Sequence, residues 1–203
     1  MSTLTLATGR PTLVDRLLTR SIATDVVLVA AGAALTAVAA QITVPLWPVP
    51  ITGQTLAVLI VGSSLGALRG SLSMVLYAVL GIIGLPVFSD QTHGLSIVLG
   101  PTGGYIVGFI VSAALTGWLA QRNWDHRILG AITSFAAGTL VTFAIGIPWL
   151  AVVLHLDVDQ ALAAGLYPFI VGGIIKALLA AVFIRLAWFG VNRADDRRID
   201  RES

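Results

Sequence analysis

The sequence predicts an all-α, polytopic membrane protein with six transmembrane helices and both termini in the cytoplasm. Three observations carry this prediction. Of the 203 residues 57% are apolar and 11% charged, the apolar residues form long runs, and the arginines gather in alternate connections. A soluble domain of this length needs far more polar residues to cover its surface. Cysteine is absent, so neither a disulfide framework nor a thiolate metal site is available.

Six apolar runs approach the thickness of a bilayer, which a helix of about 20 residues crosses. Arg69 separates the second run from the third, and we interpret them as two helices because an arginine is less costly at the bilayer surface than at its centre. Pro148 and Pro168 predict breaks in the last two runs, because proline removes a helix hydrogen bond. The runs are Val26–Ile42, Gln54–Leu68, Gly70–Leu85, Gly103–Gln121, Ile128–Leu154 and Ala161–Phe189.

The distribution of arginine predicts the orientation. Arginines precede the first run, lie between the second and third and between the fourth and fifth, and follow the sixth, whereas the other three connections contain no Lys or Arg. Basic connections stay in the cytoplasm, so both termini are expected there. The predicted organisation is a cytoplasmic N-terminal segment (1–25), a six-helix membrane domain with the binding site (26–190) and a charged cytoplasmic tail (191–203).

Lys176 is the single lysine of the chain, and it lies within the sixth apolar run. A charge at this depth costs at least about 2.5–3.5 kcal/mol, so it normally faces a partner or a wet cavity. Side chains lean toward the N-terminus of their helix, which for this run is the external side. We interpret Lys176 as a fixed cation that faces an external cavity and awaits an anionic solute. The alternative is a lysine that snorkels to the headgroups without a role.

Two external connections supply further candidates for a binding site. The first is rich in proline and leads from Trp47 to Gln54, whose amide suits a urea or amide group of a ligand; a capping or interhelical glutamine is the alternative. The second, residues 84–105, is partly apolar and rich in glycine. We interpret it as a loop that lines a cavity, because irregular backbone at membrane depth is tolerated there. Its candidates include a helix start with free N–H groups, and an interfacial belt is the alternative for its aromatic residues. The candidate binding residues of this second connection are Phe88, Gln91, Thr92, Gly103, Gly104 and Tyr105.

Enzymatic motifs are weak or absent in the sequence. The segment Gly62–Gly66 matches the G-x-S-x-G pattern of hydrolases, with Ser64 at its centre. That pattern needs a strand–turn–helix and a histidine base, but here it lies in an apolar run and all three histidines are in connections. Gly62 and Gly66 fit a helix-packing face better. Zinc and ATP-binding motifs are absent, so we expect no catalytic residue, no metal and no cofactor.

Small residues recur at four-residue spacing in the first run, on more than one face. Such stripes let helix backbones approach closely. They predict a partner protein, with tight internal packing as the alternative. The candidates for a partner interface are Ala30, Ala33, Ala34 and Ala37.

Together these motifs resemble the BioY family, the biotin-binding S components of energy-coupling factor (ECF) transporters. The resemblance implies six helices, an externally accessible biotin site closed by loops, and a bacterial cell membrane as the location. It also implies a transmembrane coupling subunit and two cytosolic ATPase subunits as partners. The coupling subunit would meet an Ala-x-x-x-Ala surface, supplied here by Ala33 and Ala37 or by Ala30 and Ala34. The motifs are Pro48-Val49-Pro50-Ile51-Thr52-x-Gln54-Thr55, Gly84-Leu85-Pro86-Val87-Phe88, Leu99-Gly100-Pro101-Thr102-Gly103-Gly104-Tyr105 and Pro168-Phe169-…-Gly172-…-Lys176.

Two positions depart from the family pattern. Many relatives have an acid three residues before the lysine, where this chain has Gly173, and some have an asparagine in the lid where this chain has Thr92. Both positions contribute polar contacts to biotin in relatives. These hydrogen bonds must be lost or supplied by other groups, such as Gln91, Thr92, Gln54 or backbone amides. Lys176 is freer to pair with a carboxylate of the ligand.

The resemblance predicts capture of extracellular biotin and its delivery to the cytoplasm, driven by ATP hydrolysis in the partners. The alternatives are a solitary biotin carrier that works without ATPases, a membrane-embedded hydrolase that uses Ser64, and a structural or sensory subunit that binds no small solute. Uptake by the chain alone, a serine-directed probe and a biotin titration discriminate among them.

Overall fold

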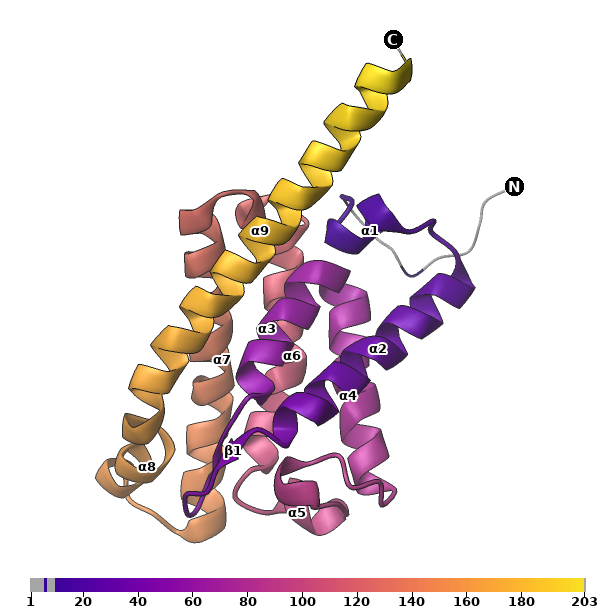
Figure 1. The fold of residues 1–203 in the computed structure, drawn as a ribbon. Helices are drawn as coiled ribbons and strands as arrows, with labels where there is room; N and C mark the ends of the chain where they lie inside the picture. Colours follow the sequence, from indigo (N-terminus) through magenta and orange to yellow (C-terminus); the bar gives the residue numbers. More distant parts are fainter. Residues whose placement is uncertain (1–5, 7–9, 203) are drawn as a thin grey trace.

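The computed structural model describes residue 6 and residues 10–202, and helices make up most of this part of the chain. The predicted all-α fold is therefore confirmed. The long helices form a bundle in which α9 extends beyond its neighbours (Figure 1). In chain order the elements are α1 Leu13–Leu17, α2 Ile22–Ala40, β1 Thr43–Val44, β2 Ile51–Thr52, α3 Gln54–Leu65, α4 Ala67–Ile82, η1 Ser89–Gln91, α5 Leu95–Leu99, α6 Gly103–Ala120, η2 Trp124–His126, α7 Ile128–Leu154, α8 Val158–Gly165, η3 Tyr167–Phe169 and α9 Ile170–Glu202.

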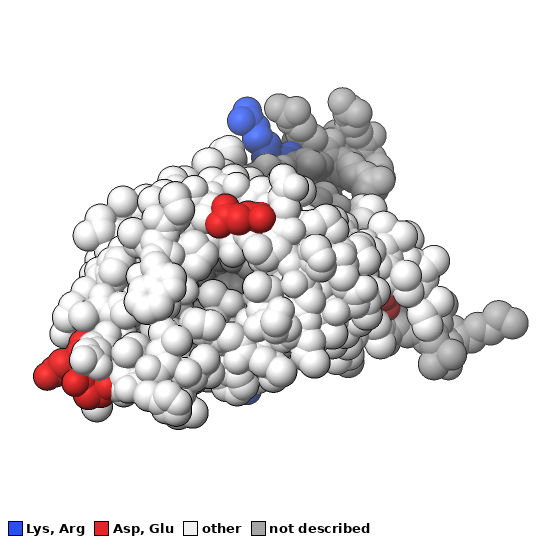
Figure 2. All heavy atoms as spheres, turned by 90° about the horizontal axis from the view of Figure 1, so that it is seen from below, with Lys and Arg blue, Asp and Glu red and all other residues white. Residues whose placement is uncertain are grey.

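The connections at one end of the bundle contain no basic residue. At one end, which we call the terminus end, lie α1 and the last turns of α9; at the other, the loop end, lie the antiparallel pair β1–β2, α5 and α8 (Figure 1). The connections at the loop end contain Asp90, Asp157 and Asp159 but no Lys or Arg. Figure 2 looks onto the loop end and shows a mostly uncharged surface with separate acidic spots.

Four of the predicted spans are long and apolar enough to cross a membrane by themselves: Ile22–Ala40, Gly103–Ala120, Ile128–Leu154 and Val158–Val191. The other two, α3 and α4, have 12 and 16 residues. At 1.5 Å per residue they are about 18 Å and 24 Å long, less than the roughly 30 Å of a hydrocarbon core. Both pack against α6.

The second and third predicted runs are separate helices, but the turn between them lies at Gly66 rather than at Arg69. Gly66 has a φ of 87°, a conformation that favours glycine. Gly117 of α6 approaches this turn so closely that a Cβ there would lie 2.3 Å from the carbonyl carbon of Gly66. Arg69 consequently falls in the first turn of α4 and is only 3% exposed. The two helices are thus observed as predicted, but the turn between them does not lie at Arg69.

Arg69 is buried because two carboxylates from the N-terminal part of the chain surround it. Its Nη2 lies 2.5 Å from Asp15 Oδ1, and its Nε lies 3.4 Å from Asp25 Oδ1. Asp15 also accepts hydrogen bonds from Arg20 Nη2 at 3.0 Å and from the backbone N–H of Thr12 at 2.9 Å. Burial alone raises the pKa of Asp15, but the hydrogen bonds from Arg69, Thr12 and Arg20 outweigh it, so this pKa lies below the ordinary 3.8. The network fixes α1 to the end of the bundle.

Of the two helix breaks predicted at prolines, the structure contains one. Pro168 lies in η3, between α8 and α9. Helix α7 instead continues through Pro148, and the prediction of a break there is wrong. A proline removes one hydrogen bond from a helix, and the packing of α7 along α6 holds the remaining turns in place.

The G-x-S-x-G segment lies at the end of α3, and its first glycine is a packing residue. A Cβ at Gly62 would lie 2.6 Å from the carbonyl oxygen of Ala113 on α6. The expected packing role of Gly62 is thus confirmed.

The predicted terminal segments are partly described. The tail assigned to 191–203 continues α9 as helix up to Glu202. Ser203 and, at the other terminus, residues 1–5 and 7–9 lie outside the described residues.

Candidate ligand-binding site

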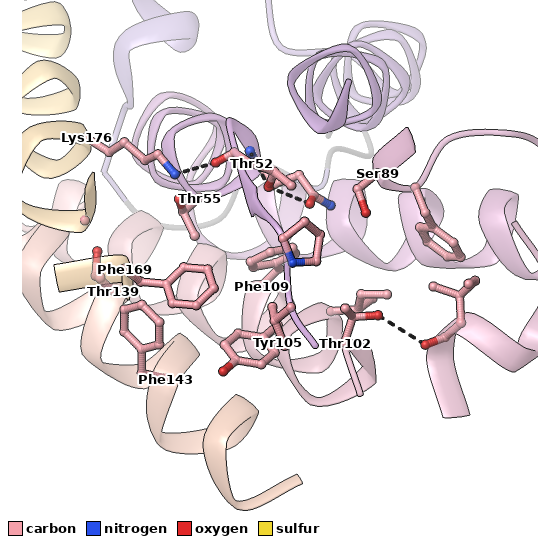
Figure 3. A pocket seen from close by; sticks show the side chains of 17 residues that line it. Thr52, Thr55, Ser89, Thr102, Tyr105, Phe109, Thr139, Phe143, Phe169 and Lys176 are labelled. Carbon is pink, nitrogen blue, oxygen red and sulfur yellow. Dashed lines mark hydrogen bonds between the residues drawn. The ribbon is translucent and has the colours of Figure 1, made fainter. Parts of the chain in front are cut away.

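A cavity opens at the loop end of the bundle, between the β1–β2 connection, α3, α6, α7 and α9 (Figure 3). It has about 670 Å³ of atom-free space, with the open solvent at its mouth included. We call it the chamber. Its lining consists of Val49, Pro50, Thr52, Gln54, Thr55, Phe88, Ser89, Ile97, Thr102, Tyr105, Ile106, Phe109, Thr139, Phe143, Phe169, Gly173 and Lys176.

Lys176 is the single basic residue of this lining, which contains no acidic residue. The side chain comes from α9, is partly buried and reaches toward the loop end, where Nζ donates a hydrogen bond to the carbonyl oxygen of Thr52 (Figure 3). An ammonium group has three N–H donors, so two remain for a ligand. Lys176 forms no salt bridge with any of the described residues, so none of them neutralises its charge.

Gln54 begins α3 on another wall of the chamber and is 7% exposed. Its Nε2 donates to the hydroxyl of Tyr77 at 2.6 Å, and its Oε1 accepts from Thr52 Oγ1 at 2.7 Å. These two bonds fix the orientation of the amide and leave one N–H donor and one acceptor position unused. The amide is therefore held ready for a group that both accepts and donates hydrogen bonds.

An aromatic cluster forms the floor of the chamber. The ring of Tyr105 is nearly perpendicular to that of Phe143, with a centroid distance of 6.1 Å, and is stacked on that of Phe169 at 6.4 Å. The centroids of Phe143 and Phe169 are 5.9 Å apart. The hydroxyl of Tyr105 donates to the carbonyl oxygen of Gly165 at 2.9 Å, so its polar end is satisfied away from the chamber. The cluster presents an apolar surface suited to rings and methylene groups.

Phe88 anchors the long connection 83–102 over the chamber. It is 2% exposed and packs edge-on against Tyr77 with a centroid distance of 5.5 Å. Its ring occupies the space beside Gly81, where a Cβ would lie 2.1 Å from the ring. This contact places Phe88 and Ser89 at the chamber and holds the connection close to the bundle.

The structure brings five of the predicted binding residues together in this lining: Lys176, Gln54, Phe88, Tyr105 and Gly173. Sequence reasoning missed further residues of the wall, notably Thr139, Phe143 and Phe109. Thr139 and Phe143 are four residues apart and so share one face of α7, but threonine and phenylalanine are common in apolar helices and gave no signal. Thr52, Thr55 and Phe169 belonged to the quoted motifs and could have been selected.

The other predicted residues of the second connection lie outside the lining. Thr92 donates its hydroxyl to the carbonyl oxygen of Ser89 at 2.8 Å, and the N–H of Gln91 donates to Gln41 Oε1 at 3.1 Å. The first bond lies within the connection, and the second joins the connection to the end of α2.

Trp47, Gly103 and Gly104 are also absent from the lining. Trp47 is 85% exposed. Gly104 is packed so closely against Trp149 that a Cβ added to the glycine would lie 2.3 Å from the Cβ of Trp149. The N–H of Gly103 donates to the carbonyl oxygen of Gly100 at 3.1 Å. The expectation of a free N–H group at Gly103 is therefore wrong, because the turn before α6 uses it.

Comparison with known proteins defines the class to which this chain belongs. The family model described as "BioY family" matches residues 10–193, and the chain is a member of that family. The resemblance of its motifs is thereby confirmed.

Individual relatives agree with this assignment. "Biotin transporter BioY2" of Lactococcus lactis subsp. cremoris is 37% identical over 156 residues, which cover 77% of this chain and 85% of that protein. "Biotin transporter BioY" of Thermotoga maritima is 37% identical over 161 residues, covering 79% and 94%. A solved structure, "Crystal structure at 2.1 A of the S-component for biotin from an ECF-type ABC transporter", superposes with a TM-score of 0.73 at 26% identity, covering 80% of this chain and 89% of that one. The family and these relatives are transporters, which is consistent with a chain that is not an enzyme.

Proposed function

We propose that this chain is the biotin-binding S component of an ECF-type vitamin transporter, which captures external biotin in the chamber and delivers it to the cytoplasm. One observation carries the proposal: a BioY-family chain has a cavity with an aromatic floor, one oriented amide and one cation without a carboxylate partner. Biotin offers a ring system, a ureido group, an aliphatic tail and a carboxylate, and each has a counterpart in the chamber.

The charge pattern suggests how the ligand lies. Biotin is an anion at neutral pH, and Lys176 is the single basic residue of the lining. The tail carboxylate would accept hydrogen bonds from the two remaining N–H groups of Lys176, and the ureido group would use the free donor and acceptor of Gln54. The rings and methylene groups would lie on the aromatic floor. Gly173 is close to the tail because it precedes Lys176 by three residues on one face of α9.

The proposed topology has six spans and both termini in the cytoplasm, so the loop end is external. The absence of Lys and Arg from the connections at the loop end supports this orientation through the positive-inside rule. The short helices α3 and α4 then form the second and third spans together with their flanking turns. The chamber opens to the outside in this arrangement.

A coupling subunit would bind to α2, and two cytosolic ATPase subunits would drive the release of biotin into the cytoplasm. The structure separates the two candidate stripes on this helix. Ala33 is buried at 1% exposure and Ala37 packs against the same cluster, whereas Ala30 and Ala34 are exposed. We therefore assign the coupling surface to Ala30 and Ala34, since close approach of helices in a membrane needs small exposed residues.

A titration of the detergent-purified chain with biotin tests the proposed ligand. We expect saturable binding with one site per chain, and weaker binding of dethiobiotin and lipoate. Absence of saturable biotin binding would overturn the proposal. Uptake of labelled biotin into vesicles, with and without the coupling subunit and ATPases, then tests the partners: uptake by the chain alone would instead identify a solitary carrier.

A further inference from the structure

A second, apolar cleft lies directly behind the chamber. It runs between α7 and α9, has about 830 Å³ of atom-free space, open side included, and is lined almost entirely by hydrocarbon side chains. Leu140 and Ile174 on its rim are 67% and 57% exposed, so the cleft opens sideways, toward the lipid-facing surface of the two helices. We call it the lateral cleft.

The chamber and the lateral cleft share one wall. Four residues line both: Thr139, Phe143, Phe169 and Gly173. Phe143 and Phe169 are nearly buried, at 8% and 9% exposure, and their rings close most of the wall. Thr139 donates its hydroxyl to the carbonyl oxygen of Phe135 at 2.8 Å, which leaves its methyl group to face Gly173.

The wall is thin at Gly173, because the glycine adds no side chain to it. A Cβ built there would meet only the methyl carbon of Thr139, at 3.8 Å, an ordinary van der Waals distance. Space is thus available on both sides of this position, and the glycine leaves it unfilled. Lys176 lies one helical turn away on the same face of α9, so the group that binds its ammonium ends next to this thin place.

We propose that the chamber and the lateral cleft form one ligand site joined at Gly173, which accepts biotin derivatives whose tail carboxyl carries an apolar chain, such as N-alkyl amides. This inference rests on the proposed function. The ring system stays on the aromatic floor, the amide carbonyl takes the place of the carboxylate at Lys176, and the alkyl chain passes Gly173 into the lateral cleft. Gly173 is then a residue that determines how far the tail of the ligand can extend.

The test compares two neutral ligands that differ only in the chain, biotin N-methylamide and biotin N-hexylamide, at one fixed detergent concentration. The hexylamide buries five more methylene groups than the methylamide, and we expect it to bind at least about tenfold more tightly. In Gly173→Leu this ratio falls to about one, because the leucine fills the passage. Gly172→Leu is the matched control, since Gly172 lines neither cavity and a Cβ there meets nothing within 4 Å, and it keeps the wild-type ratio.

Three results would overturn the inference: equal affinity of the two amides in the wild type, an unchanged ratio in Gly173→Leu, or the same loss of the ratio in Gly172→Leu. Occupation of the lateral cleft by a lipid chain would appear as the first of these. Absence of binding by biotin and both amides alike would instead contradict the proposed function, so the two failures are distinguishable.

A second measurement uses the unmodified chain and does not depend on a folded variant. A biotin N-alkylamide with a diazirine at the end of its chain is irradiated in the complex, and the labelled peptide is identified by mass spectrometry. We expect labels on α7 near Leu140 or on α9 near Ile174 and Leu178, all of which line the lateral cleft. Labels confined to the connection 83–102 would show that the chain leaves through the mouth of the chamber and would refute the passage at Gly173.

Discussion

Two cations in this molecule, the buried Arg69 and the partly buried Lys176, have opposite surroundings. Arg69 lies at the terminus end with Asp15 and Asp25 within 2.5 Å and 3.4 Å. Lys176 lies at the loop end among neutral residues and donates one hydrogen bond to a backbone carbonyl. Both pay the desolvation cost of a buried charge, but the fold compensates only the first with a carboxylate.

The difference separates a structural cation from a binding one. A charge paired within the chain has no electrostatic attraction left for a solute, whereas an unpaired charge at a cavity attracts an anion. The comparison therefore supports a stabilising role for the terminus end and the proposed ligand recognition at the loop end. The following measurements test whether the two cations have these different roles.

The largest effect is expected for Arg69→Met. Removal of this guanidinium takes away the cation that Asp15 and Asp25 share, and breaking a buried ion pair typically costs about 3–5 kcal/mol of folding free energy; we expect a loss of that order in thermal or chemical unfolding of the purified protein. Arg122→Met is the control, because Arg122 is exposed and stacks on Trp118 at 3.6 Å, an interaction of roughly 0.5–1 kcal/mol. Equal losses in the two variants would contradict a structural role for Arg69.

The next effect is on affinity. In Lys176→Met biotin should bind about 1.5–3 kcal/mol more weakly, the range for a hydrogen bond to a charged group, while the free energy of unfolding stays the same or rises because an uncompensated charge is removed. Titration calorimetry and thermal unfolding measure the two quantities. Arg185→Met serves as the control, since Arg185 is an exposed cation on the same helix. An Arg185 variant that loses as much affinity would refute a specific site at Lys176.

A smaller effect on affinity is expected for Gln54→Met. The variant loses the oriented amide and with it one or two neutral hydrogen bonds to the ligand, each of about 0.5–1.5 kcal/mol. Tyr77→Phe is the matched comparison, because Tyr77 holds the amide at 2.6 Å but does not line the chamber. Biotin titrations should therefore show a larger loss for Gln54→Met; a loss confined to Tyr77→Phe would mean that the amide only supports the wall.

The smallest effect concerns the pH dependence of stability at the terminus end. Burial raises the pKa of Asp125, although Trp188 donates to it at 2.7 Å and Ser63 at 3.5 Å. Its ionisation therefore costs stability as the pH rises through the folded-state pKa, and Asp125→Asn should melt at a higher temperature than the wild type at pH 7 but not below about pH 4.

Asp15→Asn is expected to change the melting temperature in the opposite direction. The lowered pKa of Asp15 stabilises the fold above the ordinary value of 3.8, and this contribution is lost as the pH falls through the folded-state pKa. The variant should melt at a lower temperature at pH 7, with a difference that shrinks in acid. Parallel pH profiles for Asp15→Asn and Asp125→Asn would contradict these assignments.

The sequence predicted those features that depend on unusual residues in a uniform background. Lys176 and Gln54 are polar residues at apolar runs, and the structure places both in one lining. Arg69 was misinterpreted because its partner Asp15 is 54 residues away, and no local pattern shows that pairing. Gln91 and Thr92 were selected for their polarity, but both lie outside the lining, and the hydroxyl of Thr92 donates to a backbone carbonyl of its own loop.

The wall between the two cavities could not be predicted for a related reason. Thr139 and Phe143 have side chains that are ordinary in a membrane helix, and only the packing of α7 against α9 turns them toward Gly173. The resemblance to a known family supplied the order of the motifs, not these contacts. Tertiary arrangement, rather than residue type, defines this part of the site.

The most direct test of the account is a binding cycle that combines Lys176→Met with biotin and its neutral N-methylamide. The wild type should prefer biotin by about 1.5–3 kcal/mol, because the carboxylate pairs its own charge with the ammonium whereas the amide carbonyl is a neutral acceptor, and the variant should bind the two ligands equally. If Lys176→Met keeps the preference of the wild type for biotin, the unpaired ammonium is not the group that recognises the ligand.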